Sequence, residues 1–122
     1  MEERRNERFA VPGGLSVSFS TNDAPNITRL AEIIDVSMGG LAIKYRSRRN
    51  YTDGLARLTI LAGNDLTLSC QRVYDGEGTW EGHDSISPVR RCGVKFANLS
   101  KGQIRQLRNF IRDYTDAPPL HP

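Results

Sequence analysis

Short segments in which apolar and polar residues alternate are the feature that most constrains how this chain can fold. Positions 15–19 read Leu-Ser-Val-Ser-Phe, and positions 66–70 read Leu-Thr-Leu-Ser-Cys. Since successive side chains of a β-strand point to opposite faces, each such segment predicts a strand with one buried face. The predicted strands lie at 15–19, 27–36, 41–45, 56–60, 66–70 and 92–96. Six short strands separated by Gly, Asn and Asp turns, with no helix between them, predict an antiparallel barrel or sandwich.

After residue 99 the apolar residues change to the spacing of an α-helix. The predicted stripe consists of Ile104, Leu107, Phe110, Ile111 and Tyr114. Ser100 and Gln103 have the spacing of a capping box, which marks the beginning of the helix, and Pro118-Pro119 excludes its continuation. We expect one amphipathic C-terminal helix that packs on the barrel.

The chain of 122 residues is long enough for one domain. We divide it into an N-terminal arm at 1–12, a barrel with its helix at 13–116 and a tail at 117–122. The first ten residues contain three Arg and three Glu, and too little apolar surface to offset the entropy of ordering. The arm is therefore predicted to be flexible. The Gly-rich acidic stretch at 75–87 is predicted to be a long hairpin loop, functional or simply solvated.

Composition narrows the possible classes. No apolar run approaches the roughly 20 residues of a membrane-spanning helix, and the charged start does not resemble a secretory signal. Cys70 and Cys92 each lie in an alternating segment, which favours reduced core residues and a cytoplasmic protein. The net charge of +3 is small for a nucleic-acid-binding protein. We therefore expect neither nucleic-acid binding nor membrane insertion.

Two short motifs could carry chemistry. The first is Arg4-x-x-x-Arg8 with Arg5 inside it, and the second is Asp35-x-Ser37-x-x-Gly40, which includes Gly39. Each motif alone is weak. Arg-x-x-x-Arg also occurs at 108–112, where the spacing merely places two charges on the solvated face of the helix. The second motif can be explained as turn chemistry, with Asp and Ser capping backbone N–H groups and Gly supplying positive φ.

The order of these motifs, together with the strand Cys92-Gly-Val-Lys-Phe96 before an amphipathic helix, resembles the PilZ family from Arg4 to about Tyr114. The resemblance implies a mainly β protein, a six-stranded antiparallel barrel with one C-terminal helix and a flexible N-terminal arm. It also implies that cyclic di-GMP is the ligand, bound by Arg4, Arg5, Arg8, Asp35, Ser37, Gly39 and Gly40. Glu3 stands where many members of the family have an Arg before the first motif. This difference leaves open whether one ligand binds or a stacked pair of ligands.

These residue types suit such a ligand. An Arg can bind guanine O6 and N7 with two hydrogen bonds, lie over the base or pair with phosphate. A carboxylate such as Asp35 complements the donors on the Watson–Crick edge of guanine. Ser37 can donate or accept a hydrogen bond, and Gly40, which lacks Cβ, would let a flat purine approach the backbone.

Other function classes have less support. His83 and His121 have no Cys or carboxylate at ligand spacing, and no nucleophile motif occurs, so we expect no enzyme, no catalytic residue, no metal and no cofactor. The alternatives are a PilZ-like protein-interaction module without nucleotide binding, and an oligonucleotide-binding barrel, which would need exposed aromatic residues on a strand face. The resemblance implies a receptor of bacterial second-messenger signalling that regulates a downstream effector protein. The sequence does not identify this effector.

Overall fold

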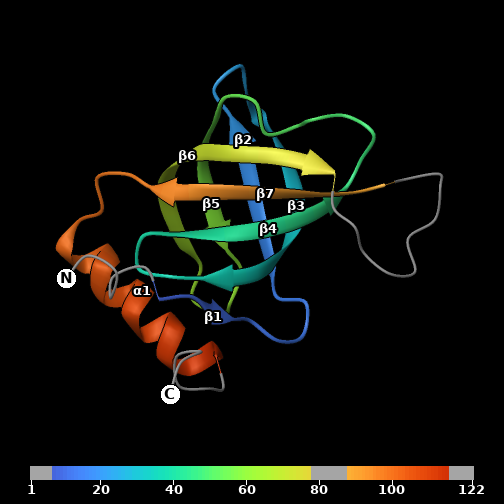
Figure 1. Cartoon of the computed structure of the whole chain (residues 1–122). Coiled ribbons are helices and arrows are strands. Elements are labelled where there is room, and N and C mark those ends of the chain that lie inside the picture. The colour runs from blue at the N-terminus through green and yellow to red at the C-terminus, as the bar shows by residue number, and fades with distance from the viewer. Residues whose placement is uncertain (1–6, 78–87, 116–122) are drawn as a thin grey trace.

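The computed structural model describes residues 7–77 and 88–115. It contains seven strands and one helix in the described ranges, and Figure 1 shows their arrangement. The strands are β1 (Phe9–Ala10), β2 (Ser16–Thr21), β3 (Ala24–Val36), β4 (Gly40–Arg46), β5 (Leu55–Ile60), β6 (Leu66–Glu77) and β7 (Val89–Phe96), and the helix is α1 (Lys101–Tyr114).

Six of the strands close into an antiparallel barrel. The sheet runs in the order β3-β2-β5-β6-β7-β4, and β4 pairs again with β3. The short strand β1 lies outside this ring, where Phe9 and Ala10 pair with Val36 and Asp35 of β3. The prediction of a mainly β, six-stranded barrel with one C-terminal helix is therefore confirmed.

The alternation in the sequence corresponds to the inside and outside of the barrel. In β6, Leu66, Leu68 and Cys70 are buried, whereas Thr67 and Ser69 between them are exposed. The same pattern in the other strands fills the barrel with aliphatic side chains that are at most 2% exposed, which are Val17, Ile33, Val36, Leu41, Ile43, Leu58, Ile60 and Leu68. Burial of this apolar surface is the main stabilising contribution to the fold.

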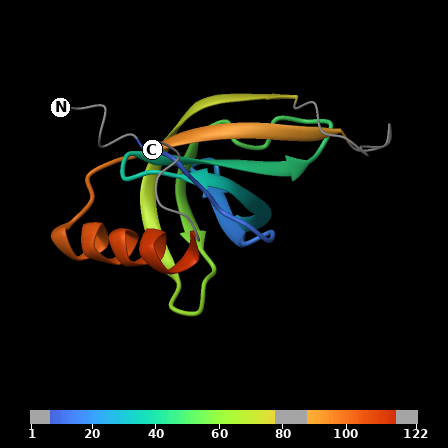
Figure 2. The ribbon, with the colours of Figure 1, turned by 60° about the horizontal axis from the view of Figure 1, so that its bottom comes forward.

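Helix α1 packs against the barrel on the side where β1 lies, as Figures 1 and 2 show. The predicted capping box is present: Ser100 Oγ accepts a hydrogen bond from Gln103 N, and Gln103 Oε1 accepts one from Ser100 N. Leu107, Phe110 and Ile111 are buried in the common core. The buried part of the apolar stripe therefore acts in core packing, whereas Tyr114 at its end is 40% exposed. The helix is too short and polar to cross a membrane, and it is the one helix of the described ranges.

The structure departs from the sequence-based prediction at the 75–87 loop. Strand β6 continues to Glu77, and Asp75, Gly76 and Glu77 pair with Cys92, Arg91 and Arg90 of β7. Glycine and acidic residues disfavour strands in general, but here cross-strand pairing overrides that preference. Residues 78–87 lie outside the described residues.

Part of the expected N-terminal arm lies in the described region. Beyond the two residues of β1, the side chain of Val11 is buried and its amide donates a hydrogen bond to Ile34 O. The stretch at 9–11 thus packs against β3. The predicted flexibility of the arm stays a prediction, since residues 1–6 lie outside the described residues.

Candidate functional site

The two sequence motifs meet at the end of β3. Arg8 Nε donates a hydrogen bond to Asp35 Oδ1 at 2.8 Å. Asp35 lies on β3 beside Ala10 of β1, so the pairing of β1 with β3 brings the arginine to the carboxylate. The Arg8 side chain is 45% exposed, and an ion pair this exposed contributes only about 0–1 kcal/mol to stability. A ligand could therefore replace the contact at little cost to the fold.

The turn after Asp35 is held by Ser37. Its Oγ accepts hydrogen bonds from the amides of Gly39 and Gly40 at 3.1 and 3.2 Å, and it donates one to Gly40 O at 3.3 Å. Ser37 is 1% exposed. Ser37 thus makes the side-chain hydrogen bonds of a turn, which is the alternative to a ligand contact. In this structure its hydroxyl is fully used inside the turn, which sets the shape of the loop between β3 and β4.

Gly40 lies where β7 approaches β4 closely. A Cβ at this position would lie 2.1 Å from Val94 O and 3.0 Å from Lys95 Cα, so the glycine lets β4 approach β7. Neither Gly39 nor Gly40 has a positive φ. In the structure, Gly40 is needed for the approach of another strand of the same chain.

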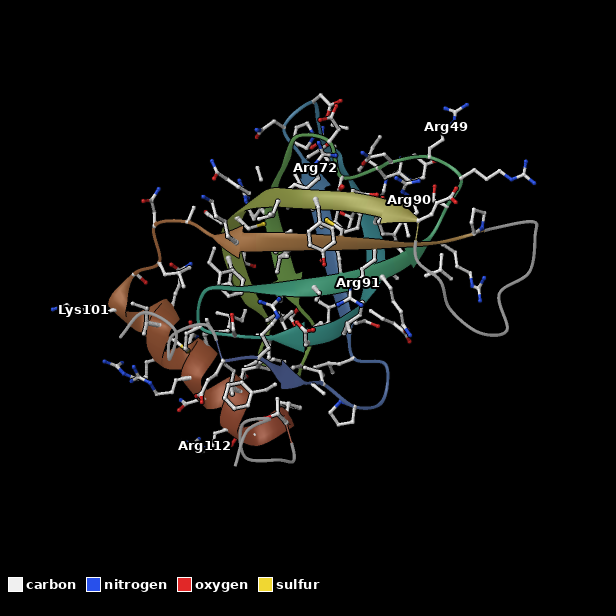
Figure 3. The ribbon with its side chains drawn as sticks, viewed as in Figure 1. Arg49, Arg72, Arg90, Arg91, Lys101 and Arg112 are labelled. Carbon is white, nitrogen blue, oxygen red and sulfur yellow. The ribbon has the colours of Figure 1, made fainter. Side chains whose placement is uncertain are left out.

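Sequence reasoning missed Arg91, which lies beside Asp35 on the outside of the barrel, and Tyr74, which contacts Arg91. Arg91 Nη2 lies 3.8 Å from Asp35 Oδ2, and Arg91 Nε donates to Tyr74 Oη at 3.3 Å. In Figure 3 the Arg91 side chain runs from β7 toward β4 and β3. Among the described residues, Asp35 therefore faces two arginines, Arg8 and Arg91. The adjacent Arg90 and Arg91 were the one signal in the sequence. It is the strand register that brings Arg91 to face Asp35.

A second polar cluster lies inside the barrel. Asp75, whose side chain is 0% exposed, accepts hydrogen bonds from Tyr45 Oη at 2.5 Å, Thr52 Oγ1 at 2.6 Å and Arg90 Nε at 2.6 Å. Burial, and then the hydrogen bond to Asp75, raises the pKa of Tyr45 to about 12. The cluster ties β4, β6, β7 and the loop containing Thr52 together. With its buried carboxylate already held by three donors of the same chain, the cluster has the character of a structural element.

Other predicted residues are placed as follows. Arg4 and Arg5 of the first motif lie outside the described residues, as do His83 and His121. Arg108 and Arg112 are exposed on α1, as expected for a solvated helix face. A groove of about 460 Å³ opens between β3 and β4, lined in part by Leu30, Lys44 and Tyr45, and none of the expected site residues lines it.

Cys70 and Cys92 are free and buried, which confirms their assignment as core residues. Burial raises the pKa of the Cys70 thiol to about 12 and that of Cys92 to about 11. Within residues 7–77 and 88–115 there is no group of three or more His, Cys, Asp or Glu side chains that could hold a metal ion.

The class of this protein is defined by two features. The fold is a small closed β-barrel, and on its outer surface Arg8 of the N-terminal segment contacts Asp35 at the end of β3. The PilZ domain model matches residues 2–113, and the chain belongs to the PilZ domain family. The resemblance inferred from the motifs is thereby confirmed. A search of curated proteins found no match.

Solved structures show the same fold. The PilZ domain of YcgR from Escherichia coli, described with c-di-GMP, is 18% identical with a TM-score of 0.71, covering 88% of this chain and 87% of that one. MrkH, described as a c-di-GMP-dependent transcription regulatory factor, is 14% identical with a TM-score of 0.68, covering 87% of this chain and 48% of that one. This chain thus spans about half the length of MrkH. The PilZ domain of CeSA from a cellulose-synthesizing bacterium is 18% identical with a TM-score of 0.57, covering 86% and 94% of the two chains.

Proposed function

We propose that this protein is a non-enzymatic receptor for cyclic di-GMP. The observation that carries the proposal is the contact between Arg8 and Asp35, which brings the two motifs to one place on the outer surface of a PilZ barrel. The structural neighbours YcgR and MrkH are described with this ligand, which supports the same ligand class here.

The expected site residues divide into two groups in this proposal. Arg8 and Asp35 are exposed enough to contact a ligand, at 45% and 18% for their side chains. Arg4 and Arg5 would add further guanidinium groups for phosphate or guanine. Ser37, Gly39 and Gly40 support the site by shaping the turn, since the Ser37 hydroxyl already bonds both glycines.

The ligand's chemistry matches this arrangement. Within the described residues, Asp35 Oδ2 is approached by Arg91 at 3.8 Å, so it can accept hydrogen bonds from the N–H groups of a guanine edge. The arginines can then bind the guanine acceptors or the phosphates with charge-assisted hydrogen bonds. A nucleotide that has both guanine edges and phosphates would contact the Asp35 carboxylate and the arginines at once.

The proposal includes a conformational change that acts on an effector protein. Residues 9–11 already pack on β3, so ordering by the ligand would concern the residues that precede Arg8. A ligand bound at Asp35 would give Arg4 and Arg8 a shared anchor whose charge-assisted bonds offset the entropy of ordering. The arm laid on the barrel would form a new surface for the partner.

Isothermal titration calorimetry of the full chain tests the proposal. Cyclic di-GMP should bind, whereas GTP, which has one guanine, and a short single-stranded DNA should bind at least tenfold more weakly. A folded sample that gives no heat with cyclic di-GMP would overturn the proposal and favour a protein-interaction module. Preferential binding of the DNA would favour an oligonucleotide-binding barrel.

A further inference from the structure

An exposed aromatic ring lies against a glycine on the same outer face of the barrel. Tyr74 of β6 pairs with Gly93 of β7 after a register shift between Arg72 and Tyr74. A Cβ on Gly93 would lie 2.2 Å from Tyr74 Cε2 and 2.8 Å from Cζ, so the ring occupies the space of the missing side chain. Tyr74 is nevertheless 45% exposed. One side of the ring therefore covers Gly93, and much of the remainder faces solvent.

Strand register places this ring in line with the proposed site. Tyr74 pairs with Gly93, Gly93 with Ala42, and Ala42 with Asp35. The ring over β7 and the carboxylate on β3 are two strand spacings apart, or about 10 Å. The residues between them have no side chain or only a methyl group. Ala42 and Gly93 are themselves buried, so a flat base would lie on the outer side of this row, against the exposed part of the Tyr74 ring.

Arg91 links the two ends of this row. Arg91 of β7 pairs with Lys44 of β4. The Arg91 side chain reaches across β4 to Asp35, and Arg91 Nε donates a hydrogen bond to the Tyr74 hydroxyl. The same guanidinium thus contacts the tyrosine and the carboxylate. This arrangement holds the hydroxyl edge of the ring toward the proposed site.

We propose that Tyr74 is a base-stacking residue of this site, an inference that rests on the proposed function. One guanine of the ligand stacks on the exposed part of the Tyr74 ring while Arg8 and Asp35 hold the polar groups. Aromatic side chains bind bases in this way because every base has a π-face. Tyr74 thus extends the site beyond the two motifs, from β3 to β6.

The competing explanation is that Tyr74 only shields Gly93, as aromatic residues do for glycines in sheets. Substitutions at Tyr74 separate the two explanations. Tyr74→Leu keeps an apolar cover on the glycine but has no π-face, whereas Tyr74→Phe and Tyr74→Trp keep the π-face. Val73→Ala is the matched control, since Val73 is the adjacent residue and is 62% exposed.

Calorimetry with cyclic di-GMP should show Tyr74→Leu binding about fivefold more weakly or worse, the lower end of what a base stack contributes. Tyr74→Phe, Tyr74→Trp and Val73→Ala should stay within about threefold of the unsubstituted chain. Tm values measured alongside establish that each variant is folded. Equal affinity of Tyr74→Leu and the unsubstituted protein would overturn the inference but leave the proposed function intact, whereas no binding by the unsubstituted protein would overturn both.

A second measurement does not depend on the Leu variant folding. The four tyrosines give distinct ring resonances in a ring-labelled sample, and the Tyr74→Phe spectrum identifies the Tyr74 signal. Stacking on a purine should move that signal upfield on titration with cyclic di-GMP, and an intermolecular NOE should join the ring to a guanine H8. Absence of both effects at saturation would contradict stacking.

Discussion

Arg8 and Asp35 are 27 positions apart in the sequence, and a 2.8 Å hydrogen bond from Nε to Oδ1 joins them. This contact connects the segment before β1 to the end of β3. Both side chains are partly exposed, so the pair lies on the surface, where solvent weakens its contribution to folding. The arrangement is therefore more important for the proposed ligand site than for the stability of the barrel.

Arg8→Ala should weaken binding of cyclic di-GMP by about 1.5–3 kcal/mol, the range for a hydrogen bond to a charged group. The free energy of unfolding should change by less than about 1 kcal/mol because the ion pair is exposed. Calorimetry and urea denaturation give the two values. Arg108→Ala, in the matching motif on α1, is the control and should bind normally. Equal losses in both variants would mean that overall charge holds the ligand.

Hydrogen exchange should locate the ligand-induced change in the N-terminal segment. We expect amides at positions 2–8 to gain protection on addition of cyclic di-GMP, while those of β4, β6 and β7 exchange equally slowly with and without it. The closed barrel is already fully paired, so a ligand can add little order there. Exchange should be measured by mass spectrometry or NMR. An N-terminal segment that is equally protected in both states would contradict the proposed change.

Gly40→Ala should destabilise the barrel by about 1–3 kcal/mol, because the added methyl group meets Val94 O on the neighbouring backbone. Urea denaturation measures the change. Gly76→Ala is the matched control: a Cβ there would have nothing within 4 Å, and Gly76 also lies in a strand. A Gly40→Ala variant as stable as the control would show that β4 and β7 can separate without cost.

Asp75→Ala should cost about 3–5 kcal/mol of stability, the usual result of removing one partner from a buried ion pair. The Arg90 side chain, 13% exposed, would lose its carboxylate, and Tyr45 and Thr52 would lose their acceptor. Asp113→Ala removes an exposed ion pair with Arg112 and should cost less than about 1 kcal/mol. Chemical denaturation of both variants tests the contrast, and similar small effects would argue against a structural role for the cluster.

Both thiols should be inert toward a disulfide reagent such as DTNB at pH 8 in the native protein. Burial raises their pKa values to about 12 for Cys70 and about 11 for Cys92, so the reactive thiolate is scarce and shielded. In the unfolded chain they ionise near the ordinary value of 9.0. The native state thus holds more protons at alkaline pH, and stability should fall as pH rises above about 9. Rapid reaction of the folded protein would contradict this.

Much of the barrel could be predicted from local sequence. Alternation identified the buried faces of the strands, as in Leu66, Leu68 and Cys70, and Ser100 with Gln103 marked the beginning of the helix. The motifs also singled out Arg8 and Asp35, which the structure brings together. Such features are predictable because they depend on side-chain direction and capping within a few residues.

The remaining features depend on register between distant strands. Strand β1, the continuation of β6 through Asp75 and the reach of Arg91 to Asp35 all arise from pairing partners far along the chain. The alternation in the sequence by itself determined a barrel or sandwich and the C-terminal helix, and the motifs singled out candidate site residues. Only the tertiary structure decided that Gly40 accommodates β7 and that Tyr74 covers Gly93, because alternation specifies which face a residue occupies but not which strand lies opposite.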